Sequence, residues 1–129
     1  MESDEIGDET MRLGIDIDGV LADFNAGYIE RCISVCEKDL FPPRPFDIPI
    51  WNYPELFGYT NEEVAKVWRS IETDKNFWLN LEPYWDAMTI LERLRHLDDA
   101  GHDLYFITSR LGVMAKKQTE GWIYIKLGF

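Results

Sequence analysis

The sequence predicts an α/β domain built on a parallel β-sheet, and three observations support this fold class. Two short apolar runs, at residues 13–18 and 104–108, have the length and composition of buried strands. Helical patterns precede or follow both runs, as in sheets whose parallel strands are joined by crossover helices. The chain has 129 residues, of which 46% are hydrophobic, so it suits one folded domain. We therefore expect a parallel sheet covered by helices on both faces.

The charge balance excludes some classes of partner. The chain carries 24 acidic and 13 basic side chains, a formal net charge of −11, whereas a protein that coats duplex nucleic acid needs a basic surface. No apolar run approaches the roughly 18 residues of a membrane span. Residues 1–11 are rich in acids, do not resemble a signal peptide and are expected to form a solvated tail. We expect a cytoplasmic protein that binds neither duplex nucleic acid nor a membrane.

The first strand is followed by a predicted helix from Val20 to about Lys38. Apolar side chains recur there at spacings of three and four residues, which is the helical period. These side chains are Phe24, Tyr28, Cys32 and Val35. Cys32 and Cys36, the two cysteines of the chain, both lie in this helix. We predict that they are small buried side chains and form neither a disulfide nor a metal site.

The middle of the chain changes character at residues 40–59, which hold five prolines and several aromatic side chains. This composition predicts a packed loop without regular structure. Thr60 and Glu63 then have the spacing of a capping box, and apolar positions predict a helix that continues to Ile71. Residues 77–81 form a compact apolar segment after that helix.

The last third of the chain returns to alternating helix and strand. An amphipathic helix is predicted over residues 87–97 and ends before Gly101. The second strand, at residues 104–108, runs into Ser109 and Arg110, and a final helix is predicted over residues 112–127.

Polar side chains follow both predicted strands. Asp16 and Asp18 end the first strand and Thr108 ends the second, and the carboxyl ends of parallel strands meet at one edge of a sheet. Two carboxylates so close repel unless a cation neutralises them, and Mg²⁺ prefers such oxygen ligands. The alternative is a surface turn, for which Asp-Gly is common. The surface turn is disfavoured because two acids without a binding or catalytic role would be energetically costly beside the apolar Ile15 and Ile17.

These residues resemble the motifs of a known group of enzymes. Asp-Ile-Asp-Gly-Val-Leu-Ala-Asp-Phe, residues 16–24, resembles the first motif of phosphatases in the haloacid dehalogenase (HAD) superfamily, and Ile-Thr-Ser at 107–109 resembles the second. The first motif, together with Asn-Phe-Trp-Leu-Asn-Leu-Glu-Pro at 76–83, is similar to the 5'(3')-deoxyribonucleotidase branch. Residues 118–129 look like the helix after the second motif. The resemblance covers about residues 12–129.

The resemblance implies a Rossmann-like parallel-sheet core with an inserted helical cap. Residues 12–24 and 85–129 would form the core and residues 25–84 the cap, after an acidic tail at residues 1–11. The implied activity is a Mg²⁺-dependent phosphomonoester hydrolase, in this branch a 5'-nucleotidase that acts on (deoxy)nucleoside monophosphates.

Site residues carry over from the matching motif positions. The resemblance implies that Asp16 is the nucleophile, which forms an aspartyl-phosphate, and that Asp18 is the general acid and base. Both residues would also hold Mg²⁺, Asp18 through its backbone carbonyl. Thr108 and Ser109 would bind the phosphoryl oxygens. Arg110 supplies positive charge at the same edge, which a phosphate ester approaching an acidic protein needs.

Four further residues match positions that line the nucleoside pocket in the nucleotidase branch. They are Phe24, Phe77, Trp78 and Leu79. For these four, packing in the hydrophobic core is an equally good interpretation.

The resemblance does not extend to every part of the family's site. The family's catalytic lysine and its further metal-binding acids lie on later strands, and nothing in residues 1–129 matches them. We therefore expect a sheet that is incomplete at the C-terminus, in the N-terminal portion of a longer phosphatase or in a shortened relative completed by a partner. Its apolar edge predicts a homo-oligomer or a completing chain.

Two other functions stay open. One is a catalytically silent module that binds a metal or a nucleotide. The other is an interaction protein that docks partners through the aromatic loop at residues 41–59.

Overall fold

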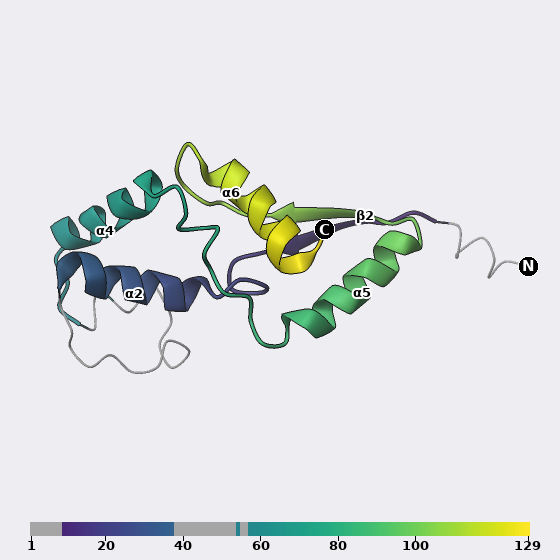
Figure 1. Ribbon diagram of the computed structural model, residues 1–129, viewed down its shortest axis with the longest axis horizontal. Coiled ribbons are helices and arrows are strands. Elements are labelled where there is room, and N and C mark those ends of the chain that lie inside the picture. The colour runs from purple at the N-terminus through teal and green to yellow at the C-terminus, as the bar shows by residue number, and fades with distance from the viewer. Residues whose placement is uncertain (1–8, 38–53, 55–56) are drawn as a thin grey trace, which may run out of the picture.

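A computed structural model of the chain describes residues 9–37, 54 and 57–129. Helices α2 and α4 lie side by side at one end of the molecule, and the strands lie with α5 and α6 toward the other end (Figure 1). The predicted tail at residues 1–11 and the predicted loop at residues 40–59 fall largely outside the described residues. In order, the elements are β1 Arg12–Asp16, α2 Phe24–Cys36, α4 Asn61–Thr73, α5 Ala87–Asp99, β2 Asp103–Ile107, α6 Ala115–Trp122 and the π-helix η3 Ile123–Leu127.

The two strands pair in parallel, which confirms the predicted fold class. Arg12 is opposite Asp103 and Asp16 is opposite Ile107, so the strands end at the same level. Of the described helices, α2, α4 and α5 lie in the chain between the strands, as expected for a parallel crossover. The sheet therefore brings the carboxyl ends of β1 and β2 to one edge.

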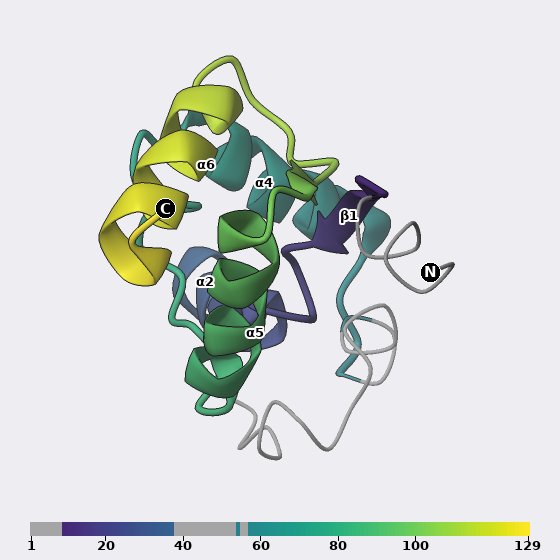
Figure 2. The ribbon, with the colours of Figure 1, turned by 90° about the vertical axis from the view of Figure 1, so that its right-hand side faces the viewer.

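The predicted cover on both faces of the sheet is wrong for the described residues. Helices α5 and α6 lie on the same side of the strands (Figure 2). Exposure alternates along both strands, so that every second residue faces solvent. On this open face the side chains of Tyr105 and Ile107 are 48% and 52% exposed. Side chains of a strand point alternately to its two faces, so only every second residue of each apolar run is packed against the helices.

A tight turn after β1 delays the first helix. The Ile17 carbonyl accepts hydrogen bonds from the amides of Leu21 at 2.8 Å and Ala22 at 2.9 Å. Gly19 has a φ of +80°, which a residue with a side chain rarely adopts. The predicted helix start at Val20 is therefore wrong. Helix α2 begins at Phe24, after the Asp23 carboxylate accepts a hydrogen bond from the Ala26 amide at 3.1 Å.

The capping box at the start of α4 is confirmed. Thr60 Oγ1 accepts from the Glu63 amide at 3.1 Å, and Glu63 Oε1 accepts from the Thr60 amide at 2.9 Å. Helix α4 packs on α2, where Arg31 reaches across to hydrogen-bond Ser70 and to form an ion pair with Asp74.

The C-terminal segment closes the core. Trp122 is fully buried and its Nε1 donates to the Leu81 carbonyl at 2.7 Å. The last helix begins at Ala115, later than predicted, because Gly112 has a φ of +114° and lies against the Glu72 backbone. In α2, Cys32 is buried and Cys36 is half-buried, and both thiols are unbridged. Burial raises the pKa of the Cys32 thiol to about 11.

Candidate active site

The edge where β1 and β2 end holds a small cavity of about 190 Å³. The last residues of both strands and the polar residues that follow them line this cavity, because the parallel register places Asp16 opposite Ile107. The residues that line it are Asp16, Asp18, Ile107, Thr108 and Ser109. The structure thus brings the two predicted catalytic carboxylates together with two of the three predicted phosphate-binding residues.

Asp18 is more constrained than Asp16. Thr108 Oγ1 donates a hydrogen bond to Asp18 Oδ2 at 2.8 Å. Arg110 donates to the same carboxylate through Nη2, at 2.8 Å from Oδ1, and through Nε, at 3.2 Å from both oxygens. Asp16, at the end of β1, is exposed at the cavity. Two acids separated by one residue therefore have different surroundings.

Arg110 lies inside the protein, although sequence reasoning assigned it to phosphate. Its side chain is 1% exposed, and its guanidinium lies 5.0 Å from the ring centre of Trp78 and 5.9 Å from that of Trp122. Its Nη1 donates to Thr119 Oγ1 at 3.1 Å. The positive charge at this edge is thus paired with Asp18.

A second cavity of about 330 Å³ opens beside the carboxylates and is rich in aromatic side chains. The rings of Phe24 and Trp78 stack, with centroids 5.4 Å apart and planes at 23°, and Trp68 lies 6.0 Å from Phe24. Asp18 and Ser109 line both cavities. The residues that line this aromatic pocket are Asp18, Phe24, Trp68, Trp78, Ser109, Arg110 and Leu111.

Trp68 is a pocket residue that sequence reasoning missed. It was one of several apolar positions expected to bury the face of a helix, and α4 does carry it on its inner side, half-buried. Its helical spacing relative to Val67 and Ile71 is that of a core position, so the sequence carried no signal that set Trp68 apart.

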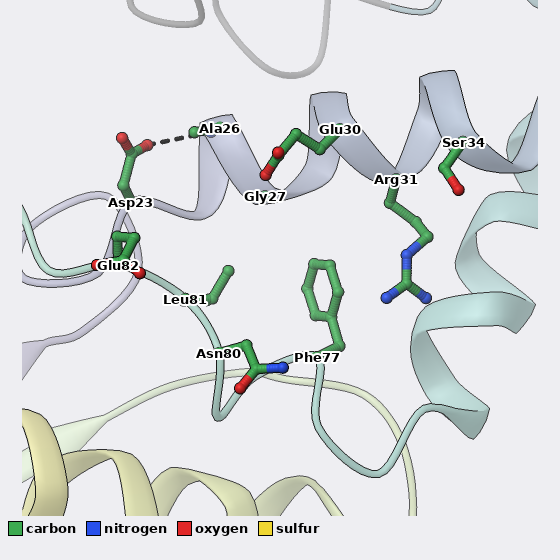
Figure 3. A pocket seen from close by; sticks show the side chains of 10 residues that line it. All are labelled: Asp23, Ala26, Gly27, Glu30, Arg31, Ser34, Phe77, Asn80, Leu81 and Glu82. Atoms are coloured by element: carbon green, nitrogen blue, oxygen red, sulfur yellow. Dashed lines mark hydrogen bonds between the residues drawn. The ribbon is translucent and has the colours of Figure 1, made fainter.

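The other two predicted pocket residues lie elsewhere. Phe77 lines a separate cavity of about 290 Å³ between α2 and residues 77–82, where the Arg31 guanidinium lies 5.0 Å from the centre of its ring (Figure 3). Leu79 packs against the hydrophobic core and faces Gly121. Neither residue lines the pocket that contains Asp18.

Gln118 is a second residue that sequence reasoning did not single out. It is buried in α6, and its Oε1 accepts hydrogen bonds from the amides of Trp78 at 2.9 Å and Leu79 at 3.4 Å. Its Nε2 donates to the Asp74 carbonyl at 3.0 Å. One side chain thereby fixes the backbone of the segment that carries Trp78.

The fit of a metal ion depends on the carboxylates at the sheet edge. Among the described residues, no three His, Cys, Asp or Glu side chains are grouped so that they could hold a metal ion. Asp16 and Asp18 nevertheless supply the hard oxygen atoms that Mg²⁺ prefers, and they line the same cavity. The donors fit Mg²⁺ in kind, with water needed for the remaining positions.

Comparison with known proteins gives one family and three relatives. The profile of the family described as "5' nucleotidase, deoxy (Pyrimidine), cytosolic type C protein" matches residues 10–129. A putative nucleotidase of Bacillus cereus is 29% identical over 92% of this chain and 60% of its own length. Mitochondrial 5'(3')-deoxyribonucleotidases are 26% identical in Homo sapiens, over 95% and 53%, and 24% in Mus musculus, over 99% and 57%.

The chain therefore spans between about half and three-fifths of the length of these relatives. Within the described residues, no helix is long and apolar enough to cross a membrane.

Proposed function

Because the chain belongs to the HAD-like 5'-nucleotidase family whose profile covers residues 10–129, we propose that it carries the nucleophile and the acid of a phosphomonoester hydrolase acting on (deoxy)nucleoside monophosphates. One observation carries the proposal. Asp16, Asp18 and Thr108 meet in a single cavity at the carboxyl edge of the sheet, next to an aromatic pocket that shares Asp18 and Ser109. A single molecule with a phosphate and a flat base could therefore reach both cavities.

In the proposed first step, a carboxylate oxygen of Asp16 attacks the phosphorus atom of the ester. The bond between phosphorus and the ester oxygen breaks, and Asp18 donates a proton to the leaving alkoxide. Water then attacks the phosphorus atom of the aspartyl-phosphate and gives a proton to Asp18, and the bond between phosphorus and the Asp16 oxygen breaks, which releases inorganic phosphate and restores the Asp16 carboxylate. The exposed position of Asp16 at the cavity supports its role as nucleophile. Ser109 would bind the phosphoryl oxygens from the end of β2, and Thr108 would do so once its hydroxyl turns from Asp18 to the phosphate.

Asp16 and Asp18 would also hold Mg²⁺. When bound, the ion supplies the positive charge that the phosphoryl group needs as negative charge builds on it. A bound cation would also offset the formal net charge of −11, which repels a phosphate.

The aromatic pocket would select the substrate. The half-buried rings of Phe24 and Trp68 line the pocket beside the buried ring of Trp78, and they offer aromatic surface against which a base can pack. Such packing tolerates different bases, so the pocket supports nucleotides as a class. Its volume of about 330 Å³ suits a small ligand.

Two further predictions concern partners and location. The exposed Tyr105 and Ile107 on the open sheet face support association with a second copy or with a completing chain. The cytoplasmic location stays a prediction, because two of the relatives are named as mitochondrial proteins.

Hydrolysis of deoxyuridine 5'-monophosphate by the 129-residue chain, with and without Mg²⁺, tests the proposal. Because nothing in residues 1–129 matches the family's catalytic lysine, we expect this chain to release phosphate slowly, in a reaction that depends on Mg²⁺ and is abolished in Asp16→Asn. Asp99→Asn, at the exposed end of α5, is the matched control and should keep the wild-type rate. An Asp16→Asn chain with full activity would show that the nucleophile lies elsewhere. Nucleotide binding without any hydrolysis would identify a silent binding module.

A further inference from the structure

The contact between Arg110 and Asp18 carries an inference that rests on the proposed function and refines it. The guanidinium donates to the Asp18 carboxylate from two nitrogens, Nη2 at 2.8 Å and Nε at 3.2 Å. A planar fork that meets a carboxylate at two points sets the orientation of the carboxylate as well as its position. Thr108 Oγ1 adds a third donor at 2.8 Å.

Arg110 is itself held in place from three sides. Its Nη1 donates to Thr119 Oγ1 at 3.1 Å, and that hydroxyl donates in turn to the Ala115 carbonyl at 2.7 Å. The rings of Trp78 and Trp122 lie 5.0 Å and 5.9 Å from the guanidinium. With 1% of its side chain exposed, Arg110 has little freedom to turn toward a ligand.

The two indoles are fixed as well. Trp122 Nε1 donates to the Leu81 carbonyl at 2.7 Å, and Trp78 Nε1 donates to the Leu111 carbonyl at 3.1 Å. A continuous set of contacts therefore runs from α6 through the guanidinium to the carboxylate at the sheet edge.

We propose that Arg110 is a positioning residue, which holds the Asp18 carboxylate at the junction of the two cavities and does not bind the phosphate of the substrate. Asp18 is 24% exposed, so without this contact its side chain could rotate into solvent. The phosphoryl group would instead be bound by residues of the small cavity, among them the exposed Ser109. Arg110 would thus orient the Asp18 carboxylate and would not attract the substrate.

The substitutions Arg110→Lys and Arg110→Met separate the two roles. Lysine keeps the positive charge but loses the planar fork, so a positioning residue is not replaced by it. For deoxyuridine 5'-monophosphate, both variants should lower kcat, by about 10²-fold for a misplaced catalytic group, and leave KM nearly unchanged. Arg93→Met, on the exposed side of α5, is the matched control for the lost charge and should change neither constant.

Binding of inorganic phosphate, followed by ³¹P NMR, gives a readout without turnover. Arg110→Met should bind phosphate with the wild-type affinity. A weaker affinity in Arg110→Met that Arg110→Lys restores would overturn the proposal, because it would make Arg110 a direct phosphate ligand.

A double-mutant cycle in urea separates failure of this inference from failure of the proposed function. A wild-type chain without nucleotidase activity contradicts the proposed function, yet the Asp18–Arg110 contact can still be measured. Arg110→Met should lower the unfolding midpoint by less in an Asp18→Asn background than in the wild type. Additive shifts would overturn the inference. If Arg110→Met does not fold, Arg110→Lys completes the same cycle.

Discussion

Asp16 and Asp18 are one residue apart, yet they meet different surroundings at the end of β1. Asp16 is exposed at the small cavity, whereas Asp18 accepts hydrogen bonds from Thr108 and Arg110. The meeting of Asp16, Asp18 and Thr108 could be predicted from sequence, because neighbouring parallel strands end at one edge. The inward turn of Arg110 could not. Its direction depends on Trp78 and Trp122, which come from distant parts of the chain.

Substitution of Asp18 by asparagine tests its proposed role as the general acid. Asp18→Asn should lower kcat for deoxyuridine 5'-monophosphate by about 10²–10⁴-fold, the usual value of positioned acid–base catalysis. The loss should be smaller for p-nitrophenyl phosphate, because its leaving group needs no proton. Steady-state rates on both substrates provide the measurement. Equal losses on the two substrates would argue against proton donation by Asp18.

Sequence motifs predicted correctly those features of helices and strands that depend on residues close together in the sequence. The capping box of α4 formed as its spacing predicted, since both of its hydrogen bonds join Thr60 and Glu63. The start of α2 was missed because the turn at Gly19 depends on the Ile17 carbonyl and on burial of Leu21. The open face of the sheet was missed because apolar composition does not report which packing partners are present.

The ion pair between Arg31 and Asp74 joins α2 to the residue that follows α4. Burial alone raises the pKa of the Asp74 carboxyl, but hydrogen bonds from Arg31 and from the backbone amides of Asn76 and Phe77, together with the charge of Arg31, outweigh it and lower the pKa below its usual value. The stabilisation is therefore present above the unfolded pKa, near 4, and is lost as the pH falls through the lower folded value.

Asp74→Asn should thus destabilise the fold by about 1 kcal/mol at pH 7. The difference from the wild type should shrink below about pH 4. Urea unfolding at a series of pH values measures both effects, with the exposed Asp98→Asn in α5 as control. A difference that stays constant to pH 3 would contradict the assignment of this stabilisation to the ionised Asp74 carboxylate.

Gln118 joins helix α6 to the segment that carries Trp78, and this link predicts a coupled loss. Gln118→Leu leaves the Trp78 amide and the Asp74 carbonyl without their partner, which should cost about 1–3 kcal/mol of unfolding free energy. The same change should weaken the binding of deoxyuridine 5'-monophosphate, because Trp78 lines the aromatic pocket. Chemical denaturation and nucleotide titration measure the two effects. The exposed Lys117→Leu is the control, and unchanged nucleotide affinity in Gln118→Leu would contradict the coupling.

At the scale of the whole molecule, the candidate site lies where two packed regions meet. The paired helices α2 and α4 supply Phe24 and Trp68, and the sheet edge supplies Asp18 and Ser109 (Figure 1). Motif spacing could predict that the site residues meet at the sheet edge, because both motifs begin at strand ends that lie at the same level. The composition of the pocket needed the tertiary structure, since Phe77 and Leu79 neighbour Trp78 in sequence but pack elsewhere. Adjacent residues in an irregular segment point in different directions, and no period identifies the one that faces a ligand.

The central claim is that Asp16 is the residue that accepts the phosphoryl group, and its chemical product can be observed directly. The chain is mixed with deoxyuridine 5'-monophosphate and Mg²⁺, quenched in acid within one turnover and analysed by peptide mass spectrometry. We expect one phosphoryl group on the peptide that contains Asp16, which hydroxylamine removes because it is an acyl phosphate, and none in Asp16→Asn. Hydrolysis that proceeds with no phosphoryl group on Asp16, or with one on another residue, would contradict the claim.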